Sequence, residues 1–291
     1  MLNSQCAVLD EQILKVFEGL ELQGAVNVDD AQLLANVRSA IRRPYPQIRP
    51  QPPNYDRVVL VGSGPSLADT EGELVALIRE GAKLVTVNGA YHWCLAHNLI
   101  PRTQIVMDAR ASNARFLEPA IPQCRYVLAS QCAPETWNVV EGRPDVWMFH
   151  AAISAEGPLK ELLDAHYLGQ WFGVGGGTTV ISRAISLLRM VGYLRFDLFG
   201  VDSCWMQGQH HAFDQPENAG EKHYQVTVAP TGSPELARAF RASGWHIKQA
   251  EDMIQVLRVN GDHFLLNIHG DGMLAYMLKT AAECCTVEAV L

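Results

Sequence analysis

The stretch Val58-Val59-Leu60-Val61-Gly62-Ser63-Gly64-Pro65-Ser66-Leu67 joins four apolar residues directly to a glycine-rich turn. A buried parallel strand has this composition, and in an open α/β sheet its carboxyl end faces a ligand crevice. Glycines allow a close backbone approach, and the N–H groups of such a turn favour anions. We therefore expect Gly62, Ser63, Gly64, Pro65 and Ser66 to bind a phosphate group; the alternative is a tight turn without a ligand.

Short apolar runs alternate with helical patterns on the carboxyl side of this stretch. Further strands are expected at residues 83–87, 104–107, 125–129, 145–149, 196–199 and 264–268. Thr70-Glu71-Gly72-Glu73 has the pattern of a capping box, which predicts that the first helix begins there. The alternation predicts an α/β fold with a Rossmann-like, doubly wound, mainly parallel sheet.

The two ends of the chain depart from this alternation. Residues 1–53 are expected to form a helical N-terminal appendage, with helical spacing over 13–20 and 33–41, followed by a proline-rich linker or extended strap at 44–53. The main domain is then expected to span 54–291. Residues 203–232 predict a long loop over the crevice, and helices at 234–243, 248–259 and 273–282 predict an α/β C-terminal extension.

Composition excludes several classes of protein. The chain has 291 residues, a net charge of −8 and a pI of about 5.7, so it is not expected to bind nucleic acid. No apolar run reaches the roughly 18 residues of a membrane span, and the first residues lack the pattern of a signal peptide. We expect a cytoplasmic protein. The seven cysteines have irregular spacing and no C-x-x-C, so neither a disulfide framework nor a structural zinc site is expected.

The glycine-rich turn differs from the dinucleotide fingerprint. Leu67 stands where the fingerprint has its third glycine, and Asn88 stands where an acidic residue would hold the ribose. A redox dinucleotide is therefore disfavoured. The Asn88 amide can instead donate a hydrogen bond to a phosphate group.

Two aspartates follow apolar strands in the same way. Asp108 and Asp202 come at predicted carboxyl ends, which line one crevice in an open sheet. They could hold Mg²⁺ on a phosphate group, or one of them could act as a base. The alternative is ordinary turn chemistry.

A second glycine-rich segment opens the strongest helical pattern. Gly175, Gly176, Gly177, Thr178 and Thr179 place glycines and two hydroxyl groups at a helix start, which favours an anion. No Gly-Lys-Ser/Thr follows, so this is not a Walker A loop. The alternative is close packing of the backbone on the sheet.

Three histidines fall within or next to the predicted loop. His210, His211 and His223 are candidates for a general acid, a general base or a phosphate contact. No H-x-E or H-E-x-x-H pattern accompanies them, so zinc is not expected. The alternative is that they are merely solvated.

Several of these segments together resemble a known family. They are Val-Gly-Ser-Gly-Pro-Ser-Leu at 61–67, Val-Asn-Gly-Ala at 87–90 with Asp108 after it, Gly-Gly-Thr-Thr-Val-Ile from 176, and Phe-Gly-Val-Asp-Ser ending at 203. Over about residues 55–225 the chain resembles the archaeal 6-hydroxymethylpterin diphosphokinase MptE and the motility accessory factor (Maf) proteins that glycosylate flagellin. It is more distantly similar to bacterial sialyltransferases that use a CMP-activated sugar.

The resemblance implies a site. It places Gly62, Gly64, Pro65, Ser66 and Asn88 on the nucleotide-phosphate side, and it assigns the same site to the residues that follow: Gly176, Gly177, Thr178 and Asp202. The sialyltransferase pattern has a tyrosine two residues after the aspartate, where this chain has Cys204. A phosphate-stabilising hydroxyl group is therefore missing.

The resulting hypothesis is a nucleotide-dependent transferase. The resemblance implies diphosphate transfer from ATP to a pterin-like alcohol, and Asp108 and Asp202 would supply either Mg²⁺ as cofactor or base chemistry. One alternative is a glycosyltransferase that uses a CMP-type nucleotide sugar, and another is a non-catalytic nucleotide- or sugar-binding module. The acceptor is not identified by the sequence, and the N-terminal appendage could pack against a second subunit as a homo-oligomer.

Overall fold

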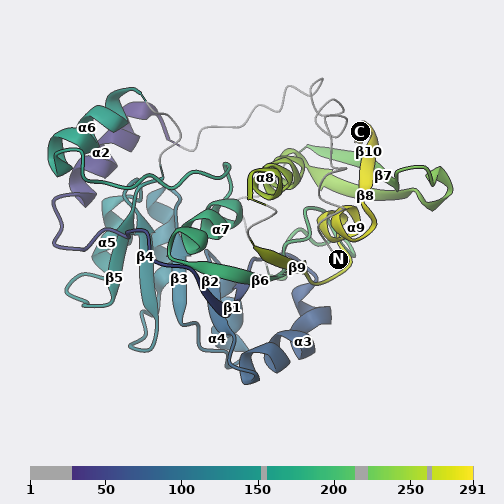
Figure 1. Ribbon diagram of the computed structural model, residues 1–291, viewed down its shortest axis with the longest axis horizontal. Helices are drawn as coiled ribbons and strands as arrows, with labels where there is room; N and C mark the ends of the chain where they lie inside the picture. The colour runs from purple at the N-terminus through teal and green to yellow at the C-terminus, as the bar shows by residue number, and fades with distance from the viewer. Residues whose placement is uncertain (1–27, 152–155, 214–221, 261–263, 291) are drawn as a thin grey trace.

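The computed structural model describes residues 28–151, 156–213, 222–260 and 264–290, arranged as two sheets with helices around them (Figure 1). The main sheet has seven parallel strands in the order β5-β4-β3-β2-β1-β6-β9. They are β1 (Asn54–Val61), β2 (Lys83–Val87), β3 (Thr103–Val106), β4 (Arg125–Ala129), β5 (Val146–Phe149), β6 (Tyr193–Phe199) and β9 (Leu265–Ile268). The predicted parallel α/β fold is confirmed. The helix expected over 13–20 lies outside the described residues.

The strand order creates one switch point. From β1 the chain moves outward through β2 to β5 and then returns to β6, on the other side of β1. The turns that follow β1 and β6 therefore lie side by side at the carboxyl edge. Gly62 N–H donates to Phe199 O and Gly64 N–H donates to Gly200 O, both at 2.8 Å. Ligand crevices of open α/β sheets form at such a point.

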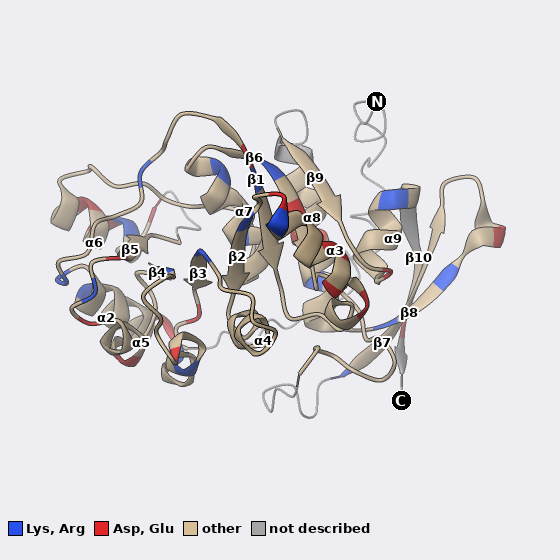
Figure 2. Ribbon diagram, turned by 90° about the horizontal axis from the view of Figure 1, so that it is seen from below, with Lys and Arg blue, Asp and Glu red and all other residues tan. Residues whose placement is uncertain are grey.

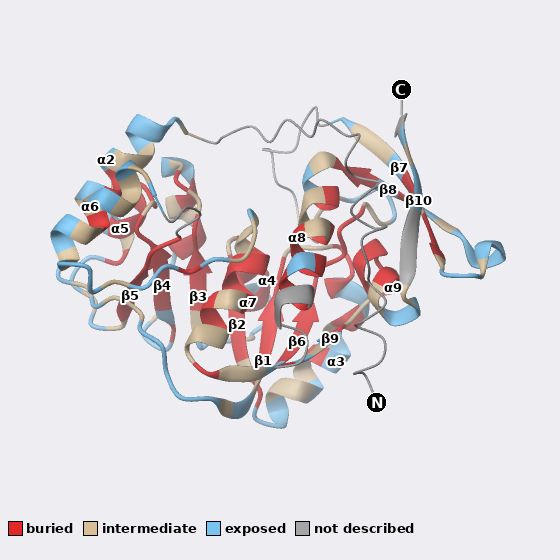
Figure 3. Ribbon diagram, turned by 45° about the horizontal axis from the view of Figure 1, so that its top comes forward, coloured by how far each residue is buried: buried red, intermediate tan, exposed pale blue. Residues whose placement is uncertain are grey.

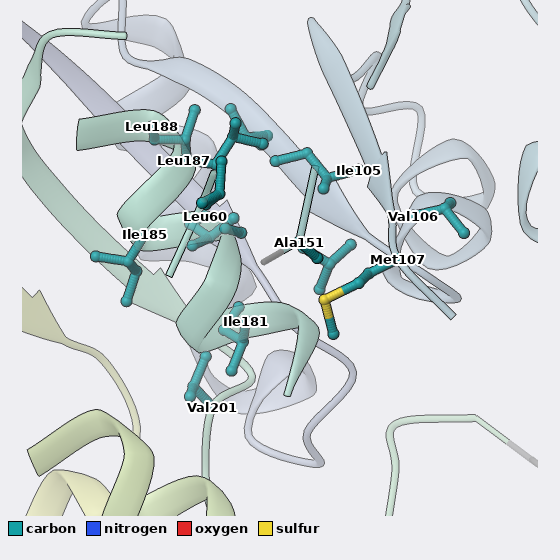
Figure 4. Packing of buried hydrophobic residues seen from close by; sticks show 14 of the residues in the cluster. Leu60, Ile105, Val106, Met107, Ala151, Ile181, Ile185, Leu187, Leu188 and Val201 are labelled. Atoms are coloured by element: carbon teal, nitrogen blue, oxygen red, sulfur yellow. The ribbon is translucent and has the colours of Figure 1, made fainter. Parts of the chain in front are cut away.

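Alternate residues of β1 pack into two hydrophobic clusters on opposite faces of the sheet. Leu60 belongs to the apolar cluster that includes α7 (Val180–Met190), and Figure 4 shows it close to that helix. Val59 and Val61 belong to the cluster that includes α3 (Leu67–Arg79). The central strands are consequently buried on both faces, as Figure 3 shows. This burial explains why the strand has a continuous apolar run.

Helix α3 begins three residues earlier than the capping-box pattern predicted. It starts at Leu67, and Thr70 lies inside it, where its hydroxyl group donates to Ser66 O. The N-terminus is capped from another segment, because Ser66 N–H donates to Asp202 Oδ2 at 3.0 Å. A tertiary contact therefore replaces the local cap.

The N-terminal segment is attached to the far edge of the sheet. Helix α2 (Asp30–Ala40) contacts α5 (Pro134–Val139) and α6 (Pro158–Tyr167). Residues 44–53 then run as an extended strap beside β5, where Ile48 N–H donates to Met148 O at 2.7 Å. The remaining elements between β2 and β4 are α4 (Ala90–Ala96) and the 3₁₀ helix η2 (Ala111–Leu117).

The C-terminal part confirms an α/β extension but differs in its elements. A second, antiparallel sheet has the order β10-β7-β8. Its strands and helices are β7 (His223–Pro230), the 3₁₀ turn η4 (Pro234–Leu236), β8 (Arg238–Ser243), α8 (Gly244–Asn260), α9 (Met273–Thr280) and β10 (Ala282–Val290). The loop expected to reach residue 232 is therefore interrupted by β7, and the helix expected at 234–243 is wrong. Residues 238–243 instead pair antiparallel with β7 along their whole length.

Within the described ranges, no helix is both long and apolar enough to cross a membrane. Lys and Arg positions are interspersed with Asp and Glu positions along the ribbon (Figure 2).

Candidate functional site

A cleft of about 440 Å³ lies at the carboxyl ends of β1, β2, β3 and β6. Most of the predicted site residues line it: Gly62, Ser63, Gly64, Pro65, Asn88, Asp108, Thr178, Thr179, Asp202, His210 and His211. Ser66 is buried beneath the first turn, and His223 does not line the cleft. Gly175, Gly176 and Gly177 line a second cavity instead.

Most backbone N–H groups of the turn after β1 donate hydrogen bonds to other groups of the protein. Gly62, Gly64 and Ser66 donate to groups at the end of β6, and Pro65 has no N–H. Among the described residues, only Ser63 in this turn keeps an N–H without a partner. A Cβ at Gly64 would lie 2.3 Å from Asp202 Oδ2, so glycine is required there by the β6 turn. Ser63 N–H is therefore the backbone donor of this turn that could contact a ligand in the cleft.

Asp202 is buried where the two turns meet. Its Oδ2 accepts from Ser66 N–H, while its Oδ1 has no hydrogen-bond partner among the described residues. Burial raises the pKa of this carboxyl group above its ordinary value. Gly270 and Gly272 of the turn before α9 pack against it. Asp202 lines the cleft, its Oδ1 is buried beside Gly270, and a carboxyl group with a raised pKa in this position is a candidate proton acceptor.

Asp108 holds an arginine that sequence reasoning missed. Arg110 Nη2 donates to Asp108 Oδ2 at 2.6 Å, and Arg110 Nε donates to Oδ1 at 3.1 Å. The Arg110 backbone N–H also donates to Oδ1. Among the described residues that line the cleft, Arg110 is the only lysine or arginine. Its signal was available in the sequence, because a cation two residues after a strand-end aspartate lies at the same edge of the sheet.

The magnesium prediction is untested. No cluster of three or more His, Cys, Asp or Glu side chains suited to a metal occurs in the part of the chain that the structure describes. Both carboxylate oxygens of Asp108 accept from Arg110, whereas Asp202 offers Oδ1. Mg²⁺ takes oxygen ligands and completes its shell with phosphate groups and water. Of the two aspartates, Asp202 is the one with an oxygen left, and that oxygen could either hold the ion or act as a base.

Asn88 adopts an uncommon backbone conformation at the edge of the cleft. Its φ is +45°, in the left-handed region that few residues other than glycine occupy. Its carbonyl oxygen accepts from Gln104 Nε2 at 2.8 Å, and this bond helps to hold the turn. The side-chain Oδ1 is buried without a partner among the described residues. Unusual backbone geometry of this kind is concentrated at functional sites.

The second glycine-rich segment binds a carboxylate from the protein's own chain. Asp252 Oδ2, on α8, accepts from Thr178 N–H at 2.5 Å and from Thr178 Oγ1 at 2.8 Å. A Cβ at Gly177 would lie 2.6 Å from the same oxygen. Thr179 caps α7, accepting from Ser182 N–H at 3.4 Å. The predicted anion cradle therefore exists, but a carboxylate fills it.

The three predicted histidines gather around Trp205, whose ring packs against those of His210 and His223, but only two of them line the cleft. His210 and His211 line the cleft, whereas His223 lies on β7 with its ring 4.8 Å from that of Trp205. Burial, together with neighbouring histidines, lowers the pKa of His210 to about 3. His210 is therefore an uncharged imidazole at neutral pH and a weak base.

Helix α8 contributes residues that sequence reasoning missed. Trp245, His246 and Gln249 line the cleft, and His246 packs against His210 with ring centroids 4.1 Å apart. They follow the second sheet in the chain, with no local pattern that points to a ligand. Only the return of the chain over the switch point brings them to the site.

Comparison with known proteins gives one family and one shared fold. The model of the family described as 6-hydroxymethylpterin diphosphokinase MptE-like matches residues 31–208, so the match begins upstream of the expected 55–225. The solved structure of a Maf glycosyltransferase from Magnetospirillum magneticum AMB-1 is similar, with a TM-score of 0.59 and 14% identity. That similarity covers 82% of this chain and 36% of the other, so this chain spans about a third of its length. No protein of curated function matches.

Proposed function

Because the chain belongs to the 6-hydroxymethylpterin diphosphokinase MptE-like family, we propose that it is a nucleotide-dependent transferase whose donor binds in the cleft at the β1–β6 switch point. The observation that carries this proposal is Arg110, a cation fixed by Asp108 at the carboxyl edge of the sheet. Asp108 takes the Nε–Nη2 edge of this guanidinium group, so phosphate would bind through its other edge, formed by Nη1 and Nη2, and clamping reduces the entropy lost on binding. Ser63 N–H and the Asn88 side chain lie in the same cleft and supply further contacts.

The specific reaction we propose is diphosphate transfer from ATP to a pterin-like alcohol. The alcohol oxygen attacks the β-phosphorus, the bond from that phosphorus to the α–β bridging oxygen breaks, and AMP leaves with the electron pair. The alcohol proton passes to a base, and Asp202 Oδ1 is the acceptor that the site offers. Arg110 would stabilise the charge on the transferring oxygens, which is the main task in phosphoryl transfer. Bound Mg²⁺ would supply further charge neutralisation.

The alternative within enzymes is glycosyl transfer from a CMP-type sugar. The cleft position of His211 favours it, since an imidazole there could assist a departing phosphate. Cys204 weighs against it. Burial raises the pKa of the Cys204 thiol to about 12, and its sulfur accepts from Met273 N–H, so it does not replace the missing tyrosine hydroxyl. Diphosphate transfer is therefore the preferred reaction.

A thermal-shift panel of ATP, CMP, CMP-sugars and GDP, each with and without Mg²⁺, separates these functions. Stabilisation by ATP that requires Mg²⁺ supports diphosphate transfer. Stabilisation by CMP without metal contradicts it and supports glycosyl transfer. Binding without turnover of any donor, for a panel of alcohol acceptors, supports a non-catalytic binding module.

The role of Arg110 is tested by substitution. Arg110→Ala removes the cation from the cleft, so we expect the Kd for ATP to rise about tenfold or more. Asp108→Asn only loosens the clamp and is expected to have a smaller effect. Arg102→Ala is the matched control, because Arg102 is exposed at the opposite end of the same strand β3.

Isothermal titration of the three variants measures these changes. Equal affinities for Arg110→Ala and the wild type would contradict the proposed donor site. A larger loss for Asp108→Asn than for Arg110→Ala would instead assign the direct contact to Asp108.

A further inference from the structure

One end of the cleft is aromatic. Trp245, in the first turn of α8, leaves 39% of its surface exposed and lines the cleft. The other five tryptophans of the chain are buried or half-buried. An indole at a cleft wall presents a flat apolar surface to whatever enters, and binding of a planar group would remove that surface from water.

The histidines beside this tryptophan carry no charge at neutral pH. His246 is buried, and its Nδ1 accepts from Ser243 N–H at 3.1 Å, so its proton is on Nε2. Burial and the neighbouring histidines lower the pKa of His246 well below its ordinary value. His210, which packs against it, is also neutral. This end of the cleft is therefore poorly suited to phosphate, in contrast to the end at Arg110.

One turn further along α8, an oriented amide completes the wall. Gln249 Oε1 accepts from Ser203 Oγ at 2.9 Å. Ser203 is itself held in the left-handed region, with φ +55°, in the turn after β6. This bond fixes the amide of Gln249, so its Nε2 is the group left to donate. Trp245 and Gln249 are four residues apart on a helix and share one face.

We propose that Trp245 and Gln249 form a subsite for a planar heteroaromatic ring. The indole stacks on the face of the ring, and Gln249 Nε2 donates to a ring nitrogen or carbonyl oxygen on its edge. This inference rests on the proposed function, because the ring is either the nucleobase of the donor or the fused ring of the acceptor. A nucleobase there would direct its own phosphate groups toward Ser63 and Arg110, and an acceptor ring would direct its hydroxyl group toward the β-phosphorus of a donor bound there.

Fluorescence titration tests the subsite directly. Wild-type protein is titrated with ATP, with a pterin alcohol and with inorganic triphosphate, which lacks a ring. Trp245→Ala is expected to weaken binding of the ring-bearing ligand about tenfold or more, because stacking on an aromatic side chain contributes on that scale. Trp245→Phe, which keeps a smaller aromatic face, is expected to lose less. Gln249→Leu is expected to weaken the same ligand.

Binding of inorganic triphosphate is expected to be unchanged in all three variants. Trp147→Phe is the control for general effects of losing a tryptophan, because Trp147 is half-buried on edge strand β5 and does not line the cleft. A loss confined to ATP assigns the subsite to the nucleobase, and a loss confined to the pterin assigns it to the acceptor.

Two outcomes would overturn the inference in distinguishable ways. If Trp245→Ala binds ATP and the pterin as tightly as the wild type, the ring subsite is wrong and the proposed function stands. If the wild type binds neither ATP nor triphosphate, the proposed donor site fails, and the ring subsite fails with it unless the pterin alcohol binds and Trp245→Ala weakens that binding.

Discussion

Two glycine-rich turns in this protein have similar sequences but differ in the hydrogen-bond partners of the carboxylate that each turn binds. The turn after β1 gives its Ser66 N–H to Asp202, and the turn before α7 gives its Thr178 N–H to Asp252. Each aspartate comes from a distant part of the chain. In both turns a glycine is required by close approach of that carboxylate, so the glycines alone do not indicate an external ligand.

The difference lies in the remaining partners of the two carboxylates. Asp252 also accepts from the Thr178 hydroxyl, and Lys248 Nζ lies 3.2 Å from its Oδ1. Asp202 interacts only with the backbone N–H and the hydroxyl group of Ser66, and no residue from another element donates to its Oδ1 in the described part of the chain. A buried polar atom without a partner is uncommon and requires an explanation. We infer that the first turn serves a ligand site and the second holds the fold together.

The largest expected effect comes from adding a methyl group at Gly64 in the first turn, compared with Gly175 in the second. Gly64→Ala would place Cβ 2.3 Å from Asp202 Oδ2 and 2.7 Å from Gly200 O, so we expect a loss of about 3 kcal/mol in the free energy of unfolding. Gly175→Ala is the matched control, because no atom lies within 4 Å of its Cβ and a change below about 0.5 kcal/mol is expected. Urea denaturation measures both. Equal midpoints would show that the first turn is not tightly packed.

Removal of the second carboxylate should affect stability and leave binding intact. Asp252→Ala leaves the Thr178 N–H and hydroxyl without their acceptor, so a loss of about 2 kcal/mol is expected. Asp252→Asn keeps an acceptor oxygen and should lose less. Affinity for ATP is expected to be unchanged in both folded variants. A folded Asp252→Asn protein that no longer binds ATP would make the second turn a ligand site and remove the distinction.

A smaller effect is expected from the pH dependence of Asp202. Because burial raises the pKa of Asp202, the folded state keeps a proton that the unfolded state has lost, over the pH window just above the ordinary carboxyl pKa. Rising pH through that window therefore destabilises the wild type. Asp202→Asn cannot lose this proton, so its stability relative to the wild type should improve as the pH rises above about 4. Urea midpoints that differ by a constant amount across this range would contradict the raised pKa.

The main sheet was predictable because its signals are local. Each strand is a short apolar run that ends at a turn, and burial between two helical layers requires that composition. The second sheet was not, because its strands are defined by pairing between distant segments. The sequence Arg-Ala-Phe-Arg-Ala-Ser at 238–243 contains good helix formers, yet pairing with β7 makes it a strand.

Some residues of the candidate site were likewise predictable from the sequence, and others were not. The strand-end residues Ser63, Asn88 and Asp202 could be found because carboxyl ends of parallel strands meet at one edge. Trp245 could not, because a helix that follows the second sheet delivers it to the cleft. The aspartate at position 252 was missed for the same reason, so the second turn was expected to be open to an external anion.

A crystal structure with a non-hydrolysable ATP analogue and Mg²⁺ tests the central claim most directly. We predict that the analogue occupies the cleft after β1 and β6, with its phosphate groups within hydrogen-bonding distance of Arg110 and Ser63 N–H. In that structure the bonds from Thr178 to Asp252 should be unchanged. An analogue bound instead in the cavity beside Gly175–Gly177, with Asp252 displaced from Thr178, would contradict the account.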